Sequence, residues 1–275
     1  MTDSPGLLFA PDFDRFFHLH EKMMWHLGAI DFGSLRRDLL TQEDVAAVRG
    51  AMLVESHNPV YTTRLLDFFR HDHEMTSFIV TWSYEEMKHY AVLRTYLESC
   101  GMVDEQDLDD ELRVTRAGPW GEAEMGFTRV QSFTYTMIQE QVTGRFYRNF
   151  ADATREPLLK EILRIIAKDE YRHCQFYLEK GKQELDADRG RLKEVDDVLL
   201  NFEMPGPTFM DYERHLEAGM RVAPFDLSAM KETVDKIAQL TGKLHLLKLA
   251  TDSAFHHKLK NELGLDLRMV LSLGR

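Results

Sequence analysis

The chain has 275 residues, of which 44% are hydrophobic and 29% charged, with a formal net charge of −12. This composition is typical of a folded globular protein and excludes a disordered or low-complexity chain. The acidic balance argues against nucleic acid or an anionic membrane as the main partner, because binding to phosphate groups depends on a basic surface.

The cysteine content and the N-terminal sequence narrow the cellular context. Cys100 and Cys174 are the only cysteines. They are too few for a disulfide framework and form no Cys-x-x-Cys pair, so both are predicted to be packed thiols. The first residues lack the basic start and apolar core of a signal peptide, and no run approaches the roughly 20 apolar residues that span a bilayer. We therefore expect a cytoplasmic protein without a membrane span.

Apolar residues recur at spacings of three and four almost throughout, which predicts an all-α fold. An N-terminal helix is expected around residues 15–27. Thr41 and Asp44 have the spacing of a capping box and predict a helix start, while Pro59 is expected to kink or end that helix. The next helix is expected from about Asp72 to Gly101, a residue suited to a helix C-terminus.

In the second half of the chain the sequence contains fewer clear signals for where helices begin and end. The polar stretch 102–121 is interpreted as a connection, and a long helix should follow over about 122–153. Pro157 suits a first helical turn, so another helix is expected to run from there to about Leu185. Residues 186–209 have a weak pattern and a turn at Pro205-Gly206-Pro207. Two more amphipathic helices are expected between Leu227 and the end.

Two copies of Glu-x-x-His interrupt the apolar stripes of two predicted helices. The stretch "YEEMKH" contains Glu86 and His89, and "KDEYRH" contains Glu170 and His173. Residues three apart lie on one helical face, so each pair should point into the interior. A buried ionised carboxylate costs several kcal/mol unless it is compensated, and these stripes contain no Lys or Arg. A metal ion is the natural counter-charge.

Two single glutamates, Glu55 and Glu140, interrupt the stripes of two other helices in the same way. One Glu from each of two helices, with Glu-x-x-His from each of two others, is the donor pattern of carboxylate-bridged dimetal proteins. Four carboxylates and two neutral imidazoles balance two divalent ions. Oxygen and imidazole donors without thiolate favour iron, with manganese as a substitute, over zinc. The predicted metal ligands are Glu55, Glu86, His89, Glu140, Glu170 and His173.

The motifs "EEMKH", "QEQVT" and "DEYRH" resemble those of the soluble acyl-acyl-carrier-protein desaturase family, a branch of the ferritin-like di-iron proteins. The third matches the family motif at every fixed position, while the first has Lys88 where the family has Arg. The resemblance covers about residues 41–182. It implies a ferritin-like four-helix bundle with additional N- and C-terminal helices, as a single domain with a metal-binding core over 41–187 and a helical extension over 188–275.

The same resemblance implies a function. It points to an oxygen-dependent desaturase that uses two iron ions, takes electrons from a ferredoxin-type donor, acts on an acyl chain bound to a carrier protein and forms a homodimer. Two alternatives stay open. One is a di-iron oxygenase that hydroxylates, N-oxygenates or cleaves a natural-product substrate, and the other is a non-catalytic protein that stores iron or retains metal for structure.

Three residues outside the ligand set receive roles from the resemblance. Thr143, one turn after Glu140, is expected on the side where dioxygen binds, although a Thr that bonds to its own helix backbone is the alternative. Asp169 is expected to orient the partner histidine and to link it to a surface tryptophan. Trp25 is the candidate for that tryptophan, with an ordinary core anchor as the alternative.

A line of basic residues recurs every four positions along the last ligand helix, and it consists of Lys160, Arg164, Lys168 and Arg172. It suits an acidic carrier protein or ferredoxin, or else it is a solvated face paired with Glu156 and Glu161. Six further histidines are expected at helix ends or on polar faces rather than as ligands. They are His18, His20, His71, His73, His256 and His257.

Overall fold

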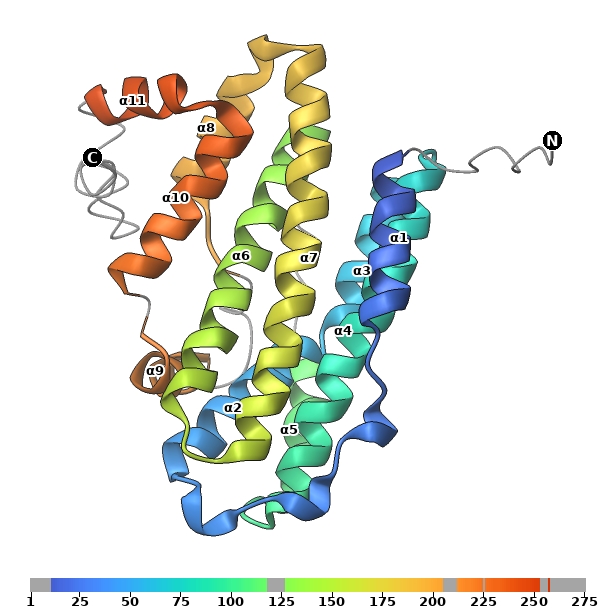
Figure 1. Cartoon of the computed structure of the whole chain (residues 1–275), viewed down its shortest axis with the longest axis vertical. Coiled ribbons are helices and arrows are strands. Elements are labelled where there is room, and N and C mark those ends of the chain that lie inside the picture. The colour runs from blue at the N-terminus through green and yellow to red at the C-terminus, as the bar shows by residue number, and fades with distance from the viewer. Residues whose placement is uncertain (1–10, 118–126, 205–211, 225, 253–256, 258–275) are drawn as a thin grey trace, which may run out of the picture. The chain divides into compact units, whose positions relative to one another are not determined.

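The computed structural model describes residues 11–117, 127–204, 212–224, 226–252 and 257. These residues form helices, turns and connections and include no strand. The α-helices are α1 (Pro11–Met23), α2 (Gln42–Glu55), α3 (Asn58–Phe68), α4 (His73–Cys100), α5 (Glu105–Ala117), α6 (Arg129–Ala153), α7 (Pro157–Ala187), α8 (Leu192–Asn201), α9 (Tyr212–Val222), α10 (Leu227–Thr241) and α11 (Lys243–Thr251) (Figure 1). None of the helices in these ranges combines the length and apolar character needed to cross a membrane.

The chain divides into two compact units, and α6 and α7 each contribute residues to both. The first unit comprises Met1–Glu122, Tyr147–Asp169 and Pro205–Ala223. In it α2 packs on α4 and α9, and α3 packs on α4. Helix α1 lies beside α4 (Figure 1). The ring of Phe16 on α1 contacts that of Phe78 on α4, with 4.7 Å between the ring centroids.

Two helices of the first unit begin where the sequence predicts. Thr41 caps α2, because its Oγ1 accepts from the Asp44 backbone N at 3.0 Å while Asp44 accepts from the Thr41 backbone N at 3.0 Å. Asp72 caps α4 by accepting from the Met75 backbone N at 3.0 Å. Helix α4 ends at Gly101, whose φ of 64° lies in the left-handed region that glycine adopts easily. The predicted starts and stops of these helices are confirmed.

The start of α7 shows that Glu156, one of the two glutamates considered as partners of the basic line, is not on a solvated face. Glu156 is fully buried and caps α7, accepting from the backbone N of Leu158 at 3.2 Å and of Leu159 at 2.6 Å. The same carboxylate accepts from the Arg36 backbone N at 3.1 Å and from the Tyr96 hydroxyl at 2.9 Å. Because its two oxygens are used by these donors, Glu156 is a structural cap and not a partner on a solvated face.

The connection predicted over 102–121 contains a helix, α5. Leu108 and Leu112 are buried, one helical turn apart, and they give this acidic stretch an apolar stripe. Glu105 and Asp107 lie in its first turn, where negative charge stabilises the helix N-terminus. The high charge of the stretch concealed a narrow stripe.

Two predicted boundaries also move. Helix α1 ends at Met23 rather than near residue 27, and His26 is extended, with φ −118° and ψ 133°. Helix α6 is described from Arg129, and residues 118–126 lie outside the described part.

The second unit comprises Ala123–Phe146, Glu170–Met204 and Pro224–Arg275. The stretch with the weak predicted pattern contains α8, which buries Val195, Val198 and Leu199. The predicted turn at Pro205-Gly206-Pro207 lies outside the described residues.

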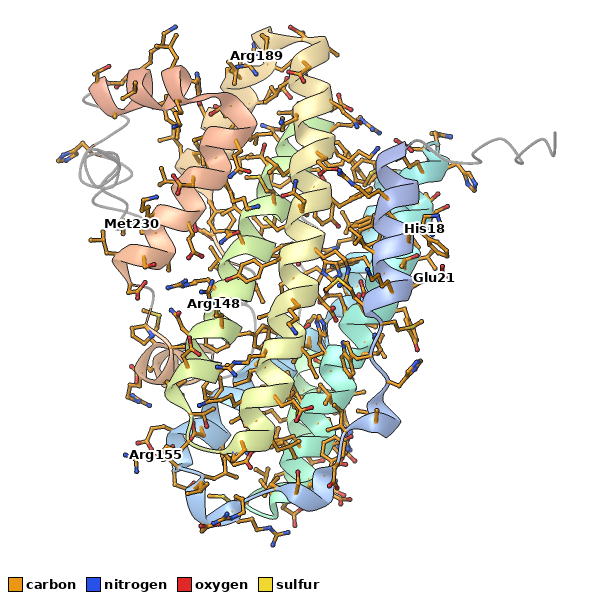
Figure 2. All side chains as sticks on the ribbon, viewed as in Figure 1. His18, Glu21, Arg148, Arg155, Arg189 and Met230 are labelled. Carbon is orange, nitrogen blue, oxygen red and sulfur yellow. The ribbon has the colours of Figure 1, made fainter. Side chains whose placement is uncertain are left out.

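The expected C-terminal helical region is α10 and α11, separated at Gly242 with a φ of 91°. Arg189 donates from Nη2 to the carbonyl of Thr241 at 2.6 Å, which satisfies a carbonyl that the end of α10 leaves open. Figure 2 labels Arg189, in the short 3-10 helix Arg189–Arg191 after α7, and Met230, on α10.

Candidate metal centre

The first unit contains a cluster of three predicted ligands, called the first cluster: Glu55, Glu86 and His89. Glu55 is the last residue of α2, and the other two lie one turn apart on α4. All three are buried, and one ligand atom from each lies within 4.8 Å of the others. Helix periodicity explains the convergence, since residues three apart on α4 project from one face.

The distances in the first cluster fit a shared cation. His89 Nδ1 lies 3.9 Å from Glu55 Oε2 and 3.8 Å from Glu86 Oε2, longer than a hydrogen bond. Two donors that bind one ion at about 2.1 Å lie roughly 3.0 to 4.2 Å apart, depending on the angle between them. The first cluster can therefore hold a metal ion.

The second unit contains the corresponding second cluster: Glu140 on α6 with Glu170 and His173 on α7. Each side chain is at most 3% exposed. His173 Nδ1 lies 3.3 Å from Glu140 Oε2 and 3.8 Å from Glu170 Oε2, and one ligand atom from each residue lies within 4.8 Å of the others. The two clusters thus repeat the same chemistry, one single Glu with one Glu-x-x-His pair.

The electrostatics of the first cluster disfavour two ionised carboxylates side by side. Burial, and then the neighbouring charge of Glu86, raise the pKa of Glu55 well above its ordinary value, although His89 and a hydrogen bond from Tyr147 act in the opposite direction. Without a metal the cluster favours the uptake of a proton, and a divalent ion removes that preference by compensating the carboxylates.

Tyr147 is a residue whose role the sequence did not predict. It is 2% exposed, and its hydroxyl donates to Glu55 Oε1. It occupies the apolar stripe of α6 two turns after Glu140, which looks like ordinary core packing in the sequence. Its partner lies on α2, so only the tertiary structure reveals that the hydroxyl fixes a predicted ligand.

Asp169 lies between His89 and Trp25. Its Oδ2 is 3.2 Å from His89 Nε2 and accepts from Trp25 Nε1 at 2.8 Å. A carboxylate on Nε2 places the proton there and leaves the Nδ1 lone pair facing Glu55 and Glu86. Trp25 is half-buried and outside the apolar core, and its ring is nearly parallel to that of His89, with 6.5 Å between centroids and 4° between planes.

Thr143 lies one turn after Glu140 on α6 and is half-buried. Within the described part of the chain its hydroxyl makes no hydrogen bond to its own helix, unlike Thr134 and Thr136, which donate to carbonyls four residues earlier.

The next residue, Gly144, lies against α7: a Cβ there would be 3.1 Å from both Glu170 Cβ and Tyr171 Cε1. The close approach of α6 and α7 at the ligand level therefore depends on this glycine.

Several predictions about polar surface residues receive different outcomes. His20 is not on a polar face: it is 6% exposed, and its Nδ1 lies 2.7 Å from Glu85 Oε1, which belongs to α4 and not to the helix of His20. His18 is exposed on α1, where Figure 2 labels it beside Glu21. His71, His73 and His257 are also exposed, and His256 lies outside the described residues.

The basic line is only partly a surface feature. Arg164 and Lys168 are exposed and Lys160 is half-buried, but Arg172 is buried. Arg164 pairs with Asp152, at 3.2 Å between Nη2 and Oδ1. Both cysteines are buried free thiols, as predicted, and burial raises the pKa of Cys174 to about 12.

A comparison with protein families decides the relationship of this chain. The sequence profile of the family described as fatty acid desaturase matches residues 31–225, well over half of the chain. The chain belongs to this family. The matched region includes all six predicted metal ligands, from Glu55 to His173, and the resemblance drawn from the motifs is confirmed.

Two curated relatives of this desaturase-family chain are about one quarter identical to it over the aligned residues. It is 26% identical over 201 residues to the acyl-[acyl-carrier-protein] desaturase DesA1 of Mycobacterium tuberculosis, which covers 70% of this chain and 59% of DesA1. It is also 26% identical over 230 residues to the chloroplastic stearoyl-[acyl-carrier-protein] 9-desaturase of Solanum commersonii, covering 77% of this chain and 58% of that enzyme. The chain thus matches about three fifths of the length of these relatives.

Solved structures show the same fold at lower identity. The crystal structure of the acyl-ACP desaturase DesA2 from Mycobacterium tuberculosis has a TM-score of 0.66 at 19% identity, covering 86% of this chain and 96% of DesA2. A variant of an R2-like ligand-binding oxidase, with an aerobically reconstituted Mn/Fe cofactor, has a TM-score of 0.51 at 16% identity, covering 94% of this chain and 93% of the oxidase. The likeness to DesA2 confirms the predicted all-α, ferritin-like fold.

Proposed function

We propose that the desaturase-family chain is an oxygen-dependent enzyme that binds two iron ions and introduces a double bond into an acyl chain carried as a thioester. The observation that carries the proposal is the repeated donor set: each cluster supplies one Glu and one Glu-x-x-His pair, and within each cluster the three buried side chains bring one ligand atom each within 4.8 Å of the others. Six such donors, without thiolate, suit two iron ions, and manganese can substitute.

The reaction balances with one dioxygen and two external electrons. A –CH2–CH2– unit loses two hydrogen atoms and becomes –CH=CH–, while dioxygen takes up those two hydrogen atoms, two electrons and two protons and becomes two waters. Two iron ions held by the six predicted ligands would supply the reduction of dioxygen and an oxidant able to remove hydrogen from an unactivated alkyl chain.

The residues of the chain have separate tasks in this proposal. The four carboxylates balance the charge of the metal ions, and burial keeps competing water away from them. Asp169 accepts from His89 Nε2 and so holds this ligand in the tautomer whose Nδ1 binds metal. Thr143, without a hydrogen bond to its own helix in the described part, is the candidate donor on the oxygen side.

The proposed partners follow from the printed names of the relatives and from charge. DesA1 and the Solanum protein are named for acyl carrier protein, so we propose a carrier-bound acyl chain as substrate. The exposed residues of the basic line, Arg164 and Lys168, with the half-buried Lys160 beside them, form the candidate surface for an acidic carrier or a ferredoxin-type electron donor. A cytoplasmic homodimer completes the proposal.

Metal analysis of matched variants tests the site. We expect Glu86→Ala and Glu170→Ala to lose bound iron and all turnover, because each leaves its cluster with one carboxylate fewer. Glu85→Ala is the control, since Glu85 lies beside Glu86 on α4 and is equally buried but pairs with His20. Full iron occupancy in both site variants, or equal loss in Glu85→Ala, would show that the ligands are wrong.

Product analysis tests the reaction. The reduced protein receives oxygen and a panel of carrier-bound acyl chains, and the products are weighed by mass spectrometry. A loss of two mass units supports desaturation, whereas a gain of one oxygen atom indicates an oxygenase on the same scaffold. Iron stoichiometry separates the remaining class: roughly two ions per chain fit an enzyme, and many per particle fit iron storage.

A further inference from the structure

Lys88 is the one residue of the two ligand motifs that departs from the family pattern, and its position is unusual. It is only 7% exposed although it carries a charged side chain. Its Nζ lies 4.5 Å from the centre of the Trp25 ring and donates to the Trp25 carbonyl oxygen at 3.3 Å. The same ammonium lies 5.5 Å from the centre of the Tyr84 ring. Lys88 therefore contacts both the backbone and the ring of one tryptophan.

Trp25 is held on its other polar atom as well. Its Nε1 donates to Asp169, which also binds His89. The segment that carries Trp25 lies between α1 and a short 3-10 turn at Leu27–Ala29, so no long helix fixes its orientation. The two side-chain contacts, from Lys88 on α4 and from Asp169 on α7, supply that orientation instead.

We propose that Lys88 is a positioning residue for Trp25: it holds the indole so that Nε1 donates to Asp169, and it makes the ring harder to oxidise to a radical cation. A cation over the face of an indole is attracted to the neutral ring. Once the ring loses an electron the same contact becomes repulsive, and burial keeps solvent from screening it. One-electron oxidation of Trp25 should therefore be slower than oxidation of the same indole without an ammonium over its face.

The balance of this step is complete. Trp25 gives up one electron to an added one-electron oxidant, and re-reduction of the indole returns that electron. The relevance of the step to oxygen chemistry rests on the proposed function, because Asp169 binds a predicted ligand. The contact itself does not, so it can be tested on the full chain without metal or substrate.

Photo-oxidation measures the electronic effect. The metal-free protein is mixed with a ruthenium tris-bipyridine dye and persulfate as the final electron acceptor, and the formation of the indole radical is followed after a flash. The same flash experiment on Trp25→Phe gives the signal of Trp82 and Trp120 alone. Subtracting that signal from the signal of the wild type leaves the contribution of Trp25. We expect Trp25 to be oxidised faster in Lys88→Met than in the wild type, on the order of tenfold.

Hydrogen exchange measures the positioning effect. The indole N–H of Trp25, assigned by its loss in Trp25→Phe, should exchange with solvent more slowly in the wild type than in Lys88→Met. Lys88→Arg should restore both the slow exchange and the slow oxidation, since it keeps a cation of similar reach. Lys180→Met is the matched control: Lys180 is 5% exposed and its Nζ lies 5.5 Å from the Phe176 ring, so its loss should leave Trp25 unchanged.

The outcomes decide the proposal. Wild-type exchange and oxidation rates in a folded Lys88→Met overturn it, as does an equal change in Lys180→Met. If Lys88→Met does not fold, Lys88→Gln replaces it, because Gln keeps a hydrogen-bond donor without the charge. In Lys88→Gln the Trp25 ring should be oxidised faster than in the wild type, while its indole N–H should still exchange slowly. If Trp25 responds to the Lys88 substitutions as expected but the wild-type protein does not desaturate acyl chains, only the proposed function is contradicted. If the protein desaturates acyl chains but Trp25 does not respond, only the proposed role of Lys88 is contradicted.

Discussion

Replacing Tyr147 by Phe removes one hydroxyl and little else, and we expect it to weaken metal binding. Tyr147 and Glu55 are 2% and 4% exposed, so water cannot replace the hydrogen bond that joins them. Loss of the partner of a ligand typically lowers metal affinity about 10- to 100-fold, which corresponds to about 1.4 to 2.8 kcal/mol. The near-complete burial of both groups favours the upper part of that range.

The pH dependence of this loss follows from the charge of Glu55. The bond from Tyr147 lowers the pKa of Glu55 against the opposing effects of burial and Glu86. Without the bond the pKa rises further, so a proton competes more effectively with the metal. The affinity difference between wild type and Tyr147→Phe should therefore be largest at low pH and shrink as the pH rises.

An anaerobic titration with ferrous iron against a competing chelator measures this affinity. Tyr96→Phe is the control, because Tyr96 is equally buried and donates to another buried carboxylate, Glu156 Oε2, at 2.9 Å. Both variants should unfold at a lower temperature, since each leaves a buried acceptor with one donor fewer, at about 1 to 3 kcal/mol. Only Tyr147→Phe should lose iron affinity. Affinity within twofold of the wild type, or equal losses in both variants, would refute the reasoning.

Three further predictions concern the oxygen side, the basic line and the metal-free state. Thr143→Val should keep both irons and bind substrate but release hydrogen peroxide or slow oxygen activation, on the order of 10²-fold, in stopped-flow and peroxide assays; wild-type coupling contradicts it. Lys160→Glu with Arg164→Glu should slow carrier association, mostly at low salt, with metal content unchanged; surface plasmon resonance across salt concentrations checks this. The raised pKa of Glu55 means that the metal-free fold keeps a proton that the unfolded chain releases near its ordinary value of 4.5, so its free energy of unfolding should fall as the pH rises between the two values. Denaturation of metal-free and iron-loaded protein tests this, and coinciding curves contradict it.

Local signals in the sequence predicted the helices that carry the clusters. The capping box at Thr41, the cap at Asp72 and the glycine at Gly101 act within one helical turn, so they are visible without tertiary structure. Helix α5 was missed because its acidic residues outnumber the apolar ones, while only Leu108 and Leu112 define the stripe. The acidic composition of this stretch made the helical spacing of its two buried leucines hard to recognise in the sequence.

The clusters were predictable for the same reason, since Glu-x-x-His is a spacing on one helix. Residues whose meaning depends on another segment were not. His20 is buried because Glu85 approaches from α4, and Glu156 is a cap that also binds Arg36 and Tyr96. A single helix shows which face a residue occupies, but not which partner reaches it.

The missing side chain at Gly144 has a consequence for which metals the second cluster accepts. A single methyl group there would meet α7 at 3.1 Å from both Glu170 and Tyr171, and the two helices would have to separate by tenths of an ångström. Bond lengths to divalent ions differ by a similar amount, from about 2.0–2.1 Å for Mg²⁺ to about 2.3–2.6 Å for Ca²⁺. A side chain at position 144 is therefore expected to move Glu140 away from Glu170 and His173, and so to shift the preference of the second cluster toward larger ions.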